Sequence, residues 1–192
     1  MKKALFIDCC LRKGSNTKKL AEAFLSELNG YDVKHLVLEN ENLKPLVGEF
    51  YEEREKILKE GNLNHDRFRY AHEFAESDLI IVAAPFWDLC FPALLKTYIE
   101  NICVDKITFD STASGLTGLC KAQNLVYLTT RGGFYKEQDN ELAIPFFKAM
   151  NNFFGIKNLH YVAADGMNVE GFDYKKSLED AKKEAKELAK SL

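Results

Sequence analysis

Residues 79–102 read LIIVAAPFWDLCFPALLKTYIENI and contain a strand, a loop and a helix in succession. Leu79–Ala84 is an apolar run typical of a parallel strand that is buried on both faces. The apolar residues within 94–102 follow helical spacing. Phe86 and Trp87 lie between these elements, at the carboxyl end of the strand, where open α/β sheets bind ligands. The two rings are therefore candidates for a ligand contact, with packing in the core as the alternative.

The composition favours a single domain spanning 1–192. The chain has 192 residues, of which 46% are hydrophobic and 29% charged, and a net charge of −3. Its sequence contains no basic block of the kind that nucleic acids need and no apolar run of the roughly 20 residues that cross a bilayer. The short apolar run at 1–10 is interrupted by Asp8 and reads as a first strand rather than a signal peptide. We expect no nucleic-acid partner, no membrane partner and a cytoplasmic location.

The cysteines and histidines predict neither a disulfide framework nor a metal site. The five cysteines form no C-x-x-C pair, and the four histidines lack metal-ligand spacing. We expect reduced cysteines that serve mainly in packing. They are Cys9, Cys10, Cys90, Cys103 and Cys120.

Apolar strands alternate with amphipathic helices along the chain. Strands are predicted at residues 4–8, 33–38, 79–84, 125–129 and 159–164. Helices are predicted after Asn16, over 49–59 and 66–76, after Pro92, over 142–154 and after Asp173. This pattern predicts a three-layer α/β fold whose five-stranded parallel sheet has the order 2-1-3-4-5, with helices on both faces.

Two connections are unusual. The segment 40–77 is longer than an ordinary crossover. It forms either a wall of a cleft or a subunit contact, or it is only a long surface connection. Ile107–Lys121 is expected to be a loop with room for a small hairpin.

In the predicted order, the loops after the first, third and fourth strands meet at one edge of the sheet. The first loop leads into a helix through Ser15, Asn16 and Thr17, where free N–H groups and the helix dipole favour an anion; a simple N-cap is the alternative. In the second loop, Phe86 and Trp87 could cover a flat ring.

The third loop, Thr130–Tyr135, contains Arg131 followed by Gly132 and Gly133. Glycines allow the backbone to approach a flat ligand closely, and Arg131 brings a positive charge. An ordinary turn and a surface ion pair are the alternatives. A phosphate on the first loop and a flat ring on the other two describe FMN better than a dinucleotide.

The same residues resemble a known family, the flavodoxin-like FMN-dependent NAD(P)H:quinone oxidoreductases and azoreductases. The matching pieces are Ser15-Asn16-Thr17, Ala84-Pro85-Phe86-Trp87 leading to Pro92 and Leu95-Lys96, Ile107-Thr108-Phe109, and Thr130-Arg131-Gly132-Gly133. The order and spacing fit from the first strand to the last, so the resemblance covers most of the chain.

The resemblance implies a homodimer with non-covalent FMN, which transfers two electrons from NADH or NADPH to a quinone or azo compound by ping-pong hydride transfer. It implies that Ser15, Asn16 and Thr17 hold the phosphate. The ring is lined by Pro85, Phe86, Trp87, Asp88 and Leu89, and its pyrimidine side is held by Thr130, Arg131, Gly132 and Gly133 with Tyr135. Phe109 and Phe134 fall on the substrate side.

No catalytic protein residue is implied, although Tyr135 is a candidate proton donor, with ring packing as its alternative role. Two other functions remain open: a flavodoxin-type electron carrier and a flavin-free α/β binding module. Fold alone does not distinguish them.

Three positions depart from the family pattern. One is Cys90, which a packing role explains adequately. Cys9 stands where the family usually has a serine near the phosphate, and a thiol is the poorer hydrogen-bond donor, which predicts weaker phosphate binding. Asp88 stands where asparagine is frequent. A carboxylate near the ring opposes an anionic reduced flavin, so we expect Asp88 to lower the reduction potential.

Overall fold

A parallel five-stranded sheet forms the centre of the protein. The computed structural model describes residues 1–113, 115–136 and 138–192. The strands lie in the order β2-β1-β3-β6-β7, which confirms the predicted order. In that spatial order they are β2 (Tyr31–Val37), β1 (Lys2–Asp8), β3 (Leu79–Ala83), β6 (Asn124–Thr130) and β7 (Asn158–Ala164).

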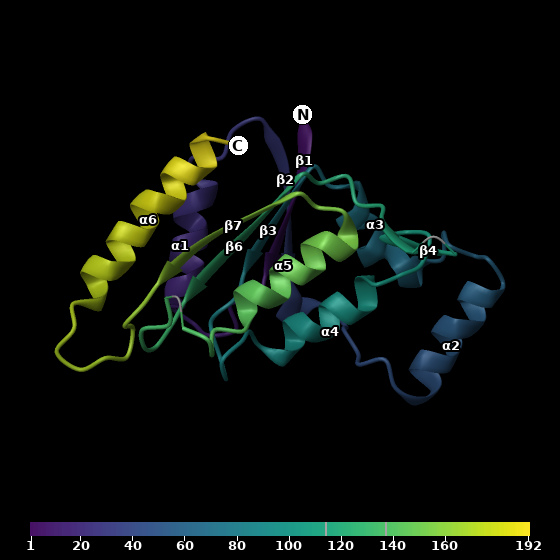
Figure 1. The fold of residues 1–192 in the computed structure, drawn as a ribbon, viewed down its shortest axis with the longest axis horizontal. Coiled ribbons are helices and arrows are strands. Elements are labelled where there is room, and N and C mark those ends of the chain that lie inside the picture. Colours follow the sequence, from purple (N-terminus) through teal and green to yellow (C-terminus); the bar gives the residue numbers. More distant parts are fainter. Residues whose placement is uncertain (114, 137) are drawn as a thin grey trace.

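Helices cover both faces of the sheet, as predicted (Figure 1). On one face α1 (Asn16–Leu25) and α6 (Tyr174–Lys190) pack on alternate strand residues such as Phe6 and Ile81. On the other face lie α3 (Arg69–Glu76), α4 (Ala93–Ile102) and α5 (Ala143–Phe154). They bury the strand residues that alternate with the first set and point to this face. Every residue of β3 is buried, because it is the central strand and both faces are covered.

The edge strand β2 is less buried than its predicted alternation implies. Among its residues only Leu36 is fully buried, and Val33 is 37% exposed. A sheet edge near solvent does not need an apolar face along its whole length.

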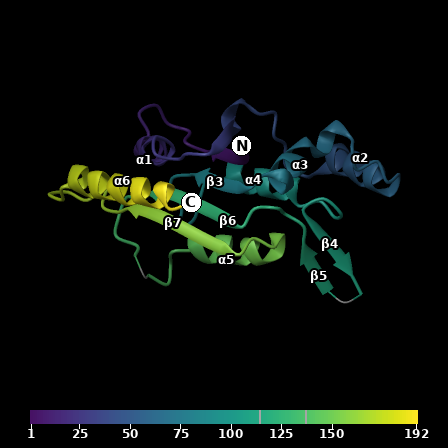
Figure 2. The same cartoon turned by 90° about the horizontal axis from the view of Figure 1, so that it is seen from above.

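The long segment 40–77 follows the 3₁₀ turn Leu38–Asn40 and contains α2 (Gly48–Lys59), a second 3₁₀ turn at Asp66–Phe68, and α3. Figures 1 and 2 show α2 standing away from the sheet. Arg54 holds it in place, because its Nη2 donates to the carbonyl of Cys103 at 2.7 Å. No described residue of this segment lines the cleft presented below, which favours a subunit contact or a long surface connection over a wall of that cleft.

The connection Ile107–Lys121 contains an antiparallel hairpin, as expected. Its strands are β4 (Phe109–Thr112) and β5 (Gly115–Gly118), while Ser114 lies outside the described residues. Gly118 packs against the end of α5, where a Cβ atom would lie 2.0 Å from the carbonyl carbon of Phe154. Only glycine allows the hairpin to approach the helix this closely.

Candidate functional site

A cleft opens at the carboxyl ends of the parallel strands, next to the neighbouring strands β1 and β3 where the strand order reverses. Loops after four different strands line it. In chain order they contribute Leu11, Arg12, Ser15, Asn16 and Thr17; Pro85, Phe86 and Trp87; Thr130 and Gly132; and Met167 and Asn168.

The beginning of α1 presents hydrogen-bond donors to this cleft. Ser15 caps the helix, since its Oγ accepts the N–H of Lys18 at 3.3 Å. Within the described parts of the chain, the N–H groups of Asn16 and Thr17 find no acceptor. Arg12 adds a guanidinium to the same wall. Unpaired N–H groups at the positive end of a helix form a suitable site for an anion such as a phosphate.

Hydrogen bonds connect the first loop to the loops on the other side of the cleft. The hydroxyl groups of Thr17 and Thr130 lie 2.7 Å apart, and Nδ2 of Asn16 contacts Sδ of Met167 at 3.7 Å. Thr17 is fully buried by these neighbours. Three segments that are distant in sequence therefore form one continuous wall.

Cys9 does not line the cleft, in contrast to its predicted place near a phosphate. The residue is fully buried and packs in the core on the α3–α5 side of the sheet. This burial raises the pKa of its thiol to about 12, so the group stays neutral. The predicted phosphate contact is not supported, because strand alternation directs this side chain inward.

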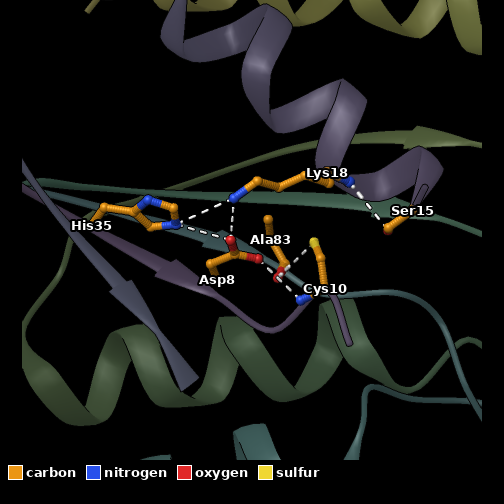
Figure 3. A network of polar contacts seen from close by, with 6 residues as sticks. All are labelled: Asp8, Cys10, Ser15, Lys18, His35 and Ala83. Atoms are coloured by element: carbon orange, nitrogen blue, oxygen red, sulfur yellow. Dashed lines mark hydrogen bonds and ion pairs between the residues drawn. The ribbon is translucent and has the colours of Figure 1, made fainter. Parts of the chain in front are cut away.

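Asp8 anchors the start of the first loop, as Figure 3 shows. Its carboxylate is 4% exposed and forms an ion pair with Nζ of Lys18. It also contacts Nε2 of His35 at 2.9 Å and accepts the N–H of Cys10 at 3.0 Å. Burial opposes the charged form, but these hydrogen bonds outweigh it and lower the pKa of Asp8. This role of Asp8 was not predicted from the sequence, although a charge that interrupts an apolar strand was a usable signal.

The second loop contains a tight two-residue turn. Trp87 and Cys90 exchange both backbone hydrogen bonds, at 2.9 and 2.8 Å. Asp88 and Leu89 have φ angles of 48° and 68°, which define a type I′ turn. Asp88 suits this conformation, whereas an αL leucine is strained. Asp88 and Leu89 are exposed and lie outside the lining of the cleft.

The loops after β6 and β7 pair with each other. Arg131 O accepts the N–H of Met167 at 3.0 Å, and Gly132 O accepts the N–H of Asn168 at 2.9 Å. A Cβ on Gly132 would lie 2.9 Å from Nδ2 of Asn168. Four lining residues were not predicted from the sequence: Leu11, Arg12, Met167 and Asn168. Met167 and Asn168 could have been identified, because ligands bind at the carboxyl ends of parallel strands and the end of β7 lies at the same edge of the sheet.

Arg131, Gly133 and Tyr135 lie behind the lining rather than in it. Arg131 is 2% exposed, and its Nε lies 2.5 Å from Oδ1 of Asp165. The ring of Tyr135 packs on Phe86, with 4.7 Å between ring centroids. These residues support the wall from the side opposite the cleft.

The predicted substrate residues also lie outside the lining. Phe109 packs on Phe153 in the hairpin region, with ring centroids 4.6 Å apart. Phe134 is 54% exposed and meets Phe172 edge-on at 5.0 Å. A substrate contact from Phe134 therefore needs a ligand that extends beyond the cleft.

The five cysteines are free. Across the described residues, no three histidine, cysteine or acidic side chains gather as a metal site would require. In the same residues, every helix is too short or too polar to cross a membrane.

Known proteins share both the sequence pattern and the fold. A family model described as "Flavodoxin-like fold" matches residues 2–189. The FMN-dependent NADH:quinone oxidoreductase 2 of Clostridium acetobutylicum is 34% identical over 182 residues, covering 92% of this chain and 91% of that protein. The enzyme of the same name from Clostridium perfringens is 32% identical over 200 residues, covering 99% of each chain.

A solved structure agrees with these relatives. The azoreductase of Bacillus anthracis superimposes with a TM-score of 0.88 at 27% identity, covering 100% of both chains.

Proposed function

This chain belongs to the flavodoxin-like fold family. From the residues of its cleft and from its named relatives, we propose that it is an FMN-dependent NAD(P)H oxidoreductase. Its acceptors are quinones or azo compounds, as the names of its relatives indicate. The curated relatives are named for NADH, which favours NADH as the donor.

The residues of the cleft fit FMN. The phosphate fits the N-terminus of α1, where the N–H groups of Asn16 and Thr17 lack acceptors among the described residues. The aromatic side chains of Phe86 and Trp87 lie in the same cleft and suit a flat ring. The combination of unpaired donors and an aromatic wall in one cleft is the observation that carries the proposal. Neither feature alone distinguishes a ligand site from an N-cap or from core packing.

Bound FMN supplies two-electron hydride chemistry, so the protein contributes binding, orientation and exclusion of water. Ser15, Asn16 and Thr17 hold the phosphate end, and Pro85–Trp87 cover the ring. Gly132 and Asn168 line the cleft on the other side, and a Cβ on Gly132 would lie 2.9 Å from Nδ2 of Asn168, so only glycine fits there without displacing Asn168. Donor and acceptor then occupy the same open side of the cleft in turn, which is the structural basis for a ping-pong order.

A second copy of the chain completes the cleft in this proposal. Trp87, Leu89 and Leu142 are 37–49% exposed, and the N–H of Leu142 donates to Leu89 O at 3.0 Å, which keeps them together. Only Trp87 of these lines the cleft, so the exposed apolar side chains form a surface next to it, and such a surface favours a protein contact. The family resemblance adds a homodimer with an active site at each side of the interface. Five free cysteines favour a reducing compartment, which supports a cytoplasmic location.

The purified protein tests the proposal in three measurements. Its absorption spectrum and the released cofactor should identify FMN. NADH alone should reduce the bound flavin once, and continued NADH oxidation should require a quinone or azo dye. Light scattering should give the mass of a dimer. Bound flavin without NADH oxidation would instead indicate an electron carrier. A colourless protein that fails to bind added FMN would indicate a flavin-free binding module and refute the proposal.

A further inference from the structure

We propose that the buried ion pair between Arg131 and Asp165 positions the ring side of the cleft from behind. The proposal rests on the function proposed above. It gives Arg131 a different role from the direct cofactor contact predicted by the sequence. Arg131 and Asp165 are positioning residues here, since neither side chain lines the cleft.

One carboxylate joins two loops. Oδ1 of Asp165 lies 2.5 Å from Nε of Arg131, and Oδ2 accepts the N–H of Tyr135 at 3.1 Å. The backbone of Asp165 is itself fixed, because its carbonyl accepts the hydroxyl of Ser177 in α6 at 2.9 Å. The loop after β6 is therefore held at both of its ends against the loop after β7.

The contact extends to the wall of the cleft through aromatic packing. The Tyr135 ring packs on Phe86 at 4.7 Å, and Phe86 lines the cleft. The N–H of Phe86 donates to Thr130 O at 3.2 Å, which closes the connection back to the third loop. Moving Asp165 would shift Tyr135 and, with it, the ring that faces the ligand.

Stability alone does not account for this pair. A buried ion pair gains little net free energy, because desolvation offsets the attraction, and apolar replacements are frequently neutral or stabilising. In addition, Nη1 of Arg131 is buried and has no partner within the described residues. The pair instead fixes the position of Tyr135. Arg131 holds the carboxylate of Asp165 in place, and that carboxylate accepts the N–H of Tyr135.

Hydrogen–deuterium exchange on the flavin-free protein tests the positioning without any cofactor. In Arg131→Met and Asp165→Asn, the amides of Tyr135, Met167 and Asn168 should exchange about tenfold faster. Amides of α1 should keep their rates. Because both substitutions act through one contact, the double variant should exchange no faster than the faster single variant.

Arg54→Met is the matched control. Arg54 is also a largely buried guanidinium, but it holds α2 through Cys103 O. Its loss should leave exchange at 132–135 and 165–168 unchanged. If Arg131→Met does not fold, the exchange rates of Asp165→Asn test the positioning role, since that substitution preserves the volume of the side chain.

Titration with FMN and riboflavin then tests the consequence for the ligand. Both dissociation constants should rise by the same factor, about tenfold, because the pair acts on the ring side and not on the phosphate. Wild-type exchange rates in the variants would overturn the proposal, as would faster exchange with unchanged flavin affinity. A wild-type protein that binds no FMN would refute the proposed function, and the exchange rates alone would then decide the positioning.

Discussion

Replacing Asp8 by asparagine should destabilise the folded protein by about 2 kcal/mol at neutral pH. Asp8 is buried, so the substitution leaves Lys18 and His35 facing a neutral amide. Removing one partner of a fully buried pair costs about 3–5 kcal/mol. The cost is lower here, because the side chains of Lys18 and His35 are 29% and 42% exposed and return partly to solvent. In a protein of this size, about 2 kcal/mol corresponds to a melting temperature lower by about 4–8 °C.

The effect of Asp8 should depend on pH in one direction. The folded-state pKa of Asp8 is lowered, so the carboxylate stabilises the fold fully at pH values above its unfolded pKa of about 3.9. This stabilisation is lost as the pH falls through the lower, folded-state pKa. The difference between wild type and Asp8→Asn should therefore shrink as the pH falls below about pH 4.

Urea unfolding of the flavin-free proteins across this range measures the difference. Glu179→Gln is the control, because Glu179 also has a lowered pKa and an ion pair, with Lys182, but lies on the surface of α6. It should leave the unfolding midpoint nearly unchanged. Equal stability of Asp8→Asn and wild type at pH 7, or a difference that does not shrink between pH 5 and pH 3, would refute the reasoning.

Three further substitutions test the walls of the cleft. Thr17→Val removes the 2.7 Å hydroxyl contact with Thr130 and should weaken FMN binding about 3- to 10-fold in a fluorescence titration; unchanged affinity would contradict the link between the loops. Asp88→Asn should raise the midpoint potential by only about 10–20 mV, since solvent screens this exposed carboxylate; potentiometry showing no rise would refute the effect of its charge. Gly132→Ala should displace the side chain of Asn168 and lower FMN affinity while the melting temperature changes little; unchanged FMN affinity would contradict a role for this pair in the cleft.

The sequence was sufficient to predict the sheet order and the position of the cleft. Strand β3 is apolar throughout because it is central, and the helices repeat a clear apolar spacing. These are local patterns that the fold preserves. Parallel strands then bring their carboxyl ends to one edge, so the loops containing Thr17, Phe86 and Thr130 could be expected to meet.

Side-chain direction was harder to predict. The glycine pair after Arg131 allows the arginine side chain to point either toward a ligand or away from it. Its ion pair with Asp165, 34 residues later in the chain, fixes the direction. The pairing of Asp8 with His35 likewise depends on the register of β1 against β2. Cys9 follows Asp8 directly, and strand alternation sends their side chains to opposite faces. Such contacts arise between distant segments and leave no local pattern.

Calorimetric titration of the flavin-free protein with FMN and then with riboflavin tests whether this cleft holds FMN by its phosphate at the start of α1. FMN should bind once per chain, and about 10- to 100-fold more tightly than riboflavin, because the phosphate accepts charge-assisted hydrogen bonds from the unpaired N–H groups of Asn16 and Thr17. Equal affinity for the two flavins, or no binding of FMN, would contradict that assignment.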